Sequence, residues 1–88
     1  MIDAELIGFA AALLTTTAFA PQVIRTWRLG GHELSWGMLA LFATGLLLWL
    51  AYGVARGSAP LVAANGLTLL QVLAMAGIKL RTARRGHP

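Results

Sequence analysis

The sequence predicts an all-α integral membrane protein, built as one bundle of three transmembrane helices. Hydrophobic residues make up 58% of the 88 residues and charged residues only 11%, whereas a soluble domain carries about 25% charged residues. Three long runs, 6–24, 34–55 and 57–78, contain no charged residue. About 20 helical residues span a bilayer core, and an apolar run in lipid satisfies its own backbone amides only as a helix. Each run therefore has the length and composition of one span.

The first expected span covers residues 5–25 and ends in the stretch FAPQVIRTW. The letters AFA at residues 18–20 resemble a signal-peptide cleavage site. However, Asp3 and Glu5 stand where a signal peptide carries positive charge, and two further spans follow. Pro21 cannot donate an amide hydrogen bond to the carbonyl of Thr17, so a kink is expected there. Two interpretations stay open: Pro21 ends the span early, or it serves as a hinge.

The second expected span covers residues 34–55. Gly30 and Gly31 are suited to stop the first helix, and Ser35 is suited to cap the second. The third expected span covers residues 59–80.

The loop between the second and third spans is very short. Gly57 can end one helix, Ser58 can cap the next, and Pro60 falls near a first turn, where its missing N–H costs nothing. The second and third spans are therefore expected to be antiparallel neighbours. A basic tail, residues 81–88, follows the third span.

Lysine and arginine are distributed unequally between the two sides of the predicted membrane. Of the seven such residues, only Arg56 lies on the side of the N-terminus and the second loop. The positive-inside rule then places the N-terminus outside and the tail in the cytoplasm, where it can also meet anionic lipid. The basic residues border apolar runs, so no nucleic acid partner is expected.

Several classes of chemistry find no support in the sequence. The chain has no cysteine, which excludes disulfides and thiolate metal sites. No metal-ligand cluster, nucleophile–base pair or phosphate-binding loop is present, so we expect neither an enzyme nor a cofactor or metal. No ionisable residue falls inside the three runs. Proton-driven transporters usually carry one at depth, so a passive carrier is more natural than a pump.

Three short helices can hardly enclose a path for a solute, so a cavity would need at least two copies. Small residues spaced four apart could let helix backbones approach closely; the pairs are Gly8 and Ala12, Ala40 and Thr44, and Gly53 and Gly57. In so alanine-rich a chain, packing within one bundle is the favoured interpretation of each pair.

A candidate solute site lies in the second and third spans. Trp49, Tyr52 and Arg56 are spaced to share one stripe of a helix. Counted inward from the short loop, Trp49 and Asn65 both lie about 10–12 Å deep. An indole beside an amide suits a neutral polyhydroxyl molecule. Other interpretations stay open: Trp49 could face lipid, and Asn65 could bind a neighbouring helix as structural glue.

The segments FAPQVIRTW, LLLWLAYG and AANGLTLL together resemble the bacterial SemiSWEET sugar transporters of the PQ-loop family. The resemblance covers nearly the whole chain. It implies a parallel homodimer of three-helix bundles in the plasma membrane, in which the third helix lies between the other two. It further implies facilitative transport of a mono- or disaccharide by alternating access, with the sugar held on the dimer axis.

The same resemblance implies roles for individual residues. The substrate would be bound by Trp49 and Asn65, the outer gate formed by Tyr52 and Arg56, the inner gate by Phe19 and Met38, and the hinge by Pro21 and Gln22. In several relatives an aspartate follows the gate arginine by two residues, but this chain has Ser58 there. Without that carboxylate we expect a looser outer gate.

Two other functions remain possible from the sequence. The first is a PQ-loop carrier for another small solute, such as an amino acid. The absence of charged residues at depth argues against it, because the charges of a zwitterion need partners. The second is a small structural membrane protein or a pore-forming oligomer. That class predicts that Trp49 and Asn65 can be replaced without loss of function.

Overall fold

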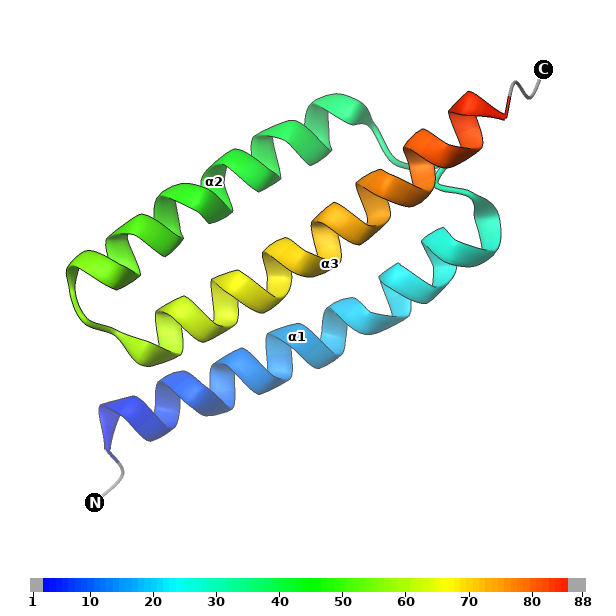
Figure 1. Ribbon diagram of the computed structural model, residues 1–88. Coiled ribbons are helices and arrows are strands. Elements are labelled where there is room, and N and C mark those ends of the chain that lie inside the picture. The colour runs from blue at the N-terminus through cyan, green and yellow to red at the C-terminus, as the bar shows by residue number, and fades with distance from the viewer. Residues whose placement is uncertain (1–2, 86–88) are drawn as a thin grey trace.

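The structure is a computed structural model that describes residues 3–85, and it consists of three helices (Figure 1). These are α1 (Ala4–Leu29), α2 (Trp36–Ala55) and α3 (Ala59–Arg84). All three are long and apolar enough to cross a membrane, which confirms the all-helical, three-span expectation. α1 and α3 each continue about one turn beyond the expected ends at residues 25 and 80. Residues 86–88 of the expected basic tail lie outside the described residues.

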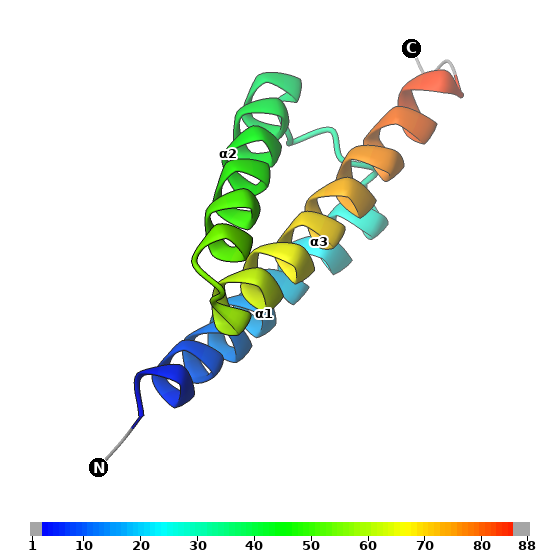
Figure 2. The same cartoon turned by 60° about the vertical axis from the view of Figure 1, so that its left-hand side comes forward.

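The third helix lies between the other two, as the resemblance implied (Figure 1). α1 and α2 each pack their backbones against α3, and α2 stands to one side of the α1–α3 pair (Figure 2). The bundle measures 56 × 23 × 14 Å, so it is long and thin. One end of the bundle holds the α1–α2 loop and the last turn of α3, and we call it the basic end. The opposite end, with the α2–α3 loop, is the Arg56 end.

The helix starts are fixed by side-chain caps. Asp3 accepts a hydrogen bond from the Glu5 amide at 3.3 Å. Ser35 accepts one from the Met38 amide at 3.2 Å, and Ser58 accepts one from the Leu61 amide at 3.3 Å. Each cap satisfies a backbone donor that has no partner within its helix. Both serine caps predicted from the sequence are therefore confirmed.

Left-handed glycines end the first two helices, as predicted. Gly30 has a φ of 82°, and its amide donates to the Thr26 carbonyl at 2.8 Å. Gly57 has a φ of 66°, and the amide of the following Ser58 reaches the Gly53 carbonyl at 2.8 Å. Residues with a Cβ disfavour this backbone conformation, which explains glycine at both ends.

Small residues bring the helices together at the Arg56 end. A Cβ atom at Gly8 would lie 2.7 Å from the Pro60 Cβ, and one at Gly53 would lie 3.1 Å from the Leu61 Cβ. α1 and α2 therefore approach α3 at glycines within one bundle. By contrast, Ala40 and Thr44 are exposed on α2, so they do not pack inside the bundle.

A small apolar cluster joins α2 to α3 toward the basic end. Its buried residues come from the first loop, α2 and α3: Leu34, Leu39, Leu46, Val72 and Met75. Most other large apolar side chains are exposed. Leu41, for example, exposes about three-quarters of its surface. This inside-out distribution fits helices that face lipid, because lipid tails accept apolar side chains as readily as a protein core does.

Pro21 does not end α1. The helix continues to Leu29, so the interpretation that this proline terminates the span early is wrong. Proline inside a helix removes one hydrogen bond of the ladder and crowds the carbonyl four residues before it, here that of Thr17. α1 is therefore one helix with an interruption in its hydrogen-bond ladder after about two-thirds of its length.

Candidate functional site

An exposed stripe of interacting side chains runs along α2 to the Arg56 end. The rings of Trp49 and Tyr52 meet edge to face, with centroids 5.7 Å apart and planes at 89°. The guanidinium carbon of Arg56 lies 6.0 Å from the centroid of the Tyr52 ring, at the outer range of a cation–π contact. The sequence spacing of one helical turn thus produces one continuous stripe.

Asn65 satisfies part of its amide within its own helix. Its Nδ2 donates to the Leu61 carbonyl at 2.9 Å, and the nearby Thr68 hydroxyl donates to the Ala64 carbonyl at 2.9 Å. Neither bond joins α3 to a neighbouring helix. A side-chain amide has two N–H donors and an oxygen acceptor, and this bond uses one donor. The half-buried Asn65 therefore keeps capacity to bind a solute.

Trp49 and Asn65 lie at matching depth on antiparallel helices. Each stands about two turns, roughly 10 Å, from the helix end that adjoins the α2–α3 loop. The Trp49 side chain is 53% exposed in a single bundle. One bundle therefore presents this indole on an open face and not in a closed pocket.

Two grooves of a single bundle lie away from Trp49 and Asn65. One groove of about 510 Å³ runs between α1 and α3 at the Arg56 end, lined by small residues that include Gly8, Ala12 and Ala64. Another, of about 770 Å³, follows α1 from Pro21 to Leu29. Neither is lined by Trp49 or Asn65. A solute that touches both of those residues would need a further wall to enclose it.

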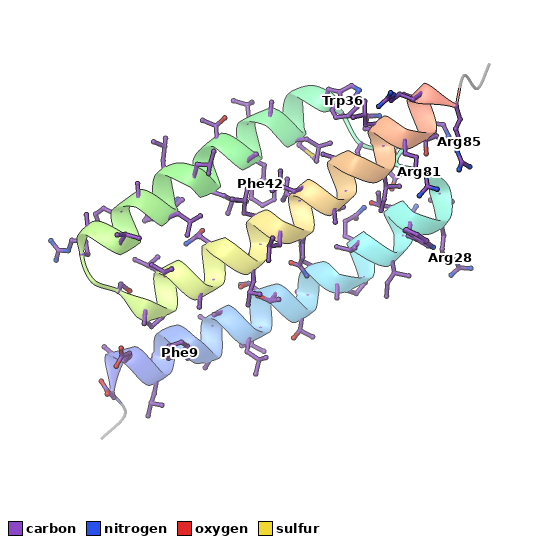
Figure 3. All side chains as sticks on the ribbon, in the orientation of Figure 1. Phe9, Arg28, Trp36, Phe42, Arg81 and Arg85 are labelled. Carbon is purple, nitrogen blue, oxygen red and sulfur yellow. The ribbon has the colours of Figure 1, made fainter. Side chains whose placement is uncertain are left out.

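Aromatic side chains from α1 and α2 meet nearer the basic end. The rings of Phe19 and Phe42 are 5.8 Å apart in a T-shaped arrangement, and Figure 3 shows Phe42 directed from α2 toward the other helices. Met38 lies one turn from Phe42 and is 45% exposed. The sequence analysis missed Phe42, although its four-residue spacing from Met38 could have placed it on the same face.

The expected hinge residue Gln22 is held at the basic end by polar contacts. Its Nε2 lies 3.4 Å from the Thr26 hydroxyl and 3.5 Å from a Glu33 carboxylate oxygen. Thr26 has no exposed surface. Gln22 thus finds one partner in its own helix and one in the first loop, as an amide near the membrane boundary needs.

Lys79 fastens the same loop to α3. Its Nζ donates to the Gly31 carbonyl at 3.1 Å and lies 5.5 Å from the centroid of the Trp36 ring. Figure 3 shows Trp36, Arg28, Arg81 and Arg85 gathered at this end. The sequence analysis used Lys79 only as a topology signal, because a contact across 48 residues leaves no local pattern.

Gln71 is a second functional candidate that the sequence analysis missed. It lies in the middle of α3, and its Nε2 donates to the backbone carbonyl of Thr16 in α1 at 3.3 Å. The available signal was a second amide, besides Asn65, within the charge-free run 57–78, because polar groups at membrane depth require partners.

Comparison with protein families gives a match over two-thirds of the chain. The family described as "PQ loop repeat" matches residues 4–62. This range includes the proline–glutamine pair and the Trp49–Tyr52–Arg56 stripe, and it stops before Asn65.

Several curated proteins are similar over most of the chain. Three are named "Sugar transporter SemiSWEET". The protein of Bradyrhizobium diazoefficiens is 45% identical, over 88% of this chain and 91% of its own. That of Leptospira biflexa is 40% identical, over 86% and 91%. That of Escherichia coli is 40% identical, over 93% of each chain. No solved structure gives a significant match.

Proposed function

Because the chain belongs to the SemiSWEET sugar transporters of the PQ-loop family, we propose that it carries a mono- or disaccharide across the bacterial plasma membrane, down its gradient. Family membership supports sugar transport and a multi-pass membrane location. The observation that carries the finer proposal is the placement of Trp49 and Asn65 at one depth on neighbouring antiparallel helices.

The substrate site lies between two copies of the chain. A bundle that is 14 Å thick in its shortest dimension is about one helix deep, so it cannot surround a sugar. Trp49 is half exposed, and the two large grooves of the single bundle do not include it. In a parallel homodimer, the open faces would meet and provide two indoles and two amides around one axis.

The chemistry of these side chains favours a neutral sugar. A sugar ring offers apolar C–H faces to an indole and hydroxyl groups to an amide that can both donate and accept. The three runs hold no ionisable residue that could balance a zwitterion or carry a coupling proton. The carrier is therefore uncoupled, and the amino-acid alternative is less favourable.

Alternating access would close the two ends in turn around this fixed site. The outer gate is formed by Tyr52 and Arg56, and the inner gate by Phe19 and Met38. Pro21 and Gln22 are the hinge, supported by the unbroken course of α1 on both sides of Pro21. The charge distribution supports a cytoplasmic basic end and an external N-terminus.

The test is uptake of labelled glucose and labelled sucrose into liposomes that hold the purified protein. Trp49→Ala and Asn65→Ala are compared with Trp27→Ala, which removes an exposed indole at the basic end. Saturable uptake of one sugar without a proton gradient, lost in the first two variants and kept in the third, supports the proposal.

Three results would contradict it. Uptake of neither sugar, with saturable uptake of an amino acid, would favour a carrier of another solute. Stepwise ion conductance would favour a pore. Sugar uptake that does not change in Trp49→Ala and Asn65→Ala would move the site elsewhere.

A further inference from the structure

Gln71 connects α3 to α1 inside the apolar part of the bundle. Its Nε2 donates to the Thr16 carbonyl at 3.3 Å, across 55 residues of sequence. The residue is half-buried, and about twelve helical residues on each side of it separate it from the ends of α3. A side-chain bond at that depth has no water to compete with it.

The same two residues hold two buried polar atoms that lack a hydrogen-bond partner. Among the described residues, these atoms are the Thr16 hydroxyl oxygen Oγ1 and the Gln71 amide oxygen Oε1. Their roles are complementary, because a hydroxyl donates and an amide oxygen accepts. A buried polar atom without a partner is costly in the membrane. The contact between Thr16 and Gln71 is therefore half-formed.

The contact lies beside the interruption in α1. Thr16 precedes Thr17, whose carbonyl lacks its usual amide donor because residue 21 is proline. The bond from Gln71 thus holds α1 to α3 just before the point at which α1 bends most easily. A change in the bend at Pro21 would turn Thr16 relative to the Gln71 amide.

We propose that Gln71 is a positioning residue that sets the bend of α1 through a two-point contact with Thr16. One point, from Nε2 to the Thr16 carbonyl, is made in the conformation described above. The second, from the Thr16 hydroxyl to Oε1, forms when α1 bends toward its other conformation. The second bond therefore biases the conformational equilibrium that transport requires. This link to transport rests on the proposed function, but the contact does not.

The two-point contact predicts the direction in which two variants shift the conformational equilibrium of α1. Thr16→Val removes only the hydroxyl, which has no partner in the described conformation, so it should favour that conformation. Gln71→Met removes one bond here and two in the other conformation, so it should shift the equilibrium in the same direction. We expect each shift to be about three- to tenfold, the usual range for a side-chain hydrogen bond between membrane helices.

Distance measurements test this directly, because the natural chain has no cysteine. Spin labels at Leu29→Cys and Leu80→Cys, both exposed at the basic end, report the separation of α1 and α3. Labelled protein is diluted into unlabelled protein so that only distances within one chain contribute. Thr15→Val is the matched control, because the Thr15 hydroxyl already bonds to carbonyls of its own helix.

The expected result is a larger population of one distance in both Gln71→Met and Thr16→Val, and no change in Thr15→Val. The double variant should resemble Gln71→Met, because both substitutions remove the same bond. In proteoliposomes, the ratio of half-saturation constants measured from the two sides should shift by the same factor. A structural role alone would lower the amount of active protein and leave that ratio unchanged.

Distance distributions that do not change in either variant would overturn the proposal. So would opposite shifts in Gln71→Met and Thr16→Val, since one contact cannot produce them. If Gln71→Met fails to fold, Thr16→Val with its matched control still decides the question. The distances are measured without sugar transport, so failure of this inference and failure of the proposed function are distinguishable.

Discussion

The guanidinium carbon of Arg56 lies 6.0 Å from the ring of Tyr52, and that ring stands edge-on to the indole of Trp49 at 5.7 Å. The proposed outer gate and the proposed substrate site are thus adjacent parts of one stripe on α2. A change at the Arg56 end can reach Trp49 through a single intervening ring.

The proposed outer gate should close more firmly when a carboxylate is added near Arg56. In the described structure the Ser58 hydroxyl accepts a hydrogen bond from the Leu61 amide and caps α3. Aspartate and asparagine cap helices about as well as serine does. Ser58→Asp therefore adds a charge without loss of the cap, and Ser58→Asn is the matched neutral control.

This prediction is measured with one spin label per chain at Ala55→Cys, an exposed position at the end of α2. We expect Ser58→Asp to increase the population of short distances between the two copies of the proposed dimer, and Ser58→Asn to leave it unchanged. An equal response to both substitutions would show that the charge has no role.

Replacing the proline of α1 should slow the conformational change. Pro21→Ala restores the amide that can bond to the Thr17 carbonyl, so α1 becomes stiffer and intrinsically more stable. We expect maximal uptake to fall by about tenfold, the effect of about 1.4 kcal/mol on a barrier. The thermal unfolding midpoint should not fall. Unchanged uptake by a folded Pro21→Ala protein would rule out the hinge.

The approach of α1 to α3 at Gly8 should tolerate no larger side chain. A Cβ atom there would lie 2.7 Å from the Pro60 Cβ, whereas one at Gly77 would meet nothing within 4 Å. Overpacking costs roughly 1–3 kcal/mol, while alanine in an open helix position gains up to about 1 kcal/mol over glycine. Thermal unfolding in detergent should therefore show a lower midpoint for Gly8→Ala and an equal or higher one for Gly77→Ala.

Loss of Lys79 should loosen the first loop. The Gly31 carbonyl accepts two hydrogen bonds, one from the Lys79 ammonium at 3.1 Å and one from the Leu34 amide at 3.1 Å. A hydrogen bond to a charged group contributes roughly 1.5–3 kcal/mol. In Lys79→Met we therefore expect the Leu34 amide to exchange at least about tenfold faster with deuterium. Arg84→Met removes the same charge from an exposed position and should leave that exchange unchanged.

Much of the fold could be predicted from the sequence because it depends on local chemistry. The charge-free runs determine the spans, Ser35 and Ser58 cap helices three residues before the amides they bind, and Gly30 and Gly57 stop helices through their own backbone freedom. The course of the first helix past Pro21 was harder to predict. A proline in a span can either stop or interrupt a helix, and the packing of α1 on α3 decides between them.

The polar contacts between helices could not be predicted. Gln71 bonds to a carbonyl 55 residues away, and Lys79 to one 48 residues away. Such contacts depend on how the helices rotate and slide against one another, which the sequence does not specify locally. The stripe of Trp49, Tyr52 and Arg56 could be predicted, because helical periodicity alone puts these residues together.

The proposed sugar site is shared by two copies of the chain. To test this, the natural chain is co-expressed with the Asn65→Ala variant at a series of ratios. Sugar uptake is then measured in liposomes that hold the mixed protein. A shared site requires both copies to be intact, so uptake should fall with the square of the natural chain's fraction. Uptake that falls in direct proportion to that fraction would show that each copy works alone, and would rule out a shared site.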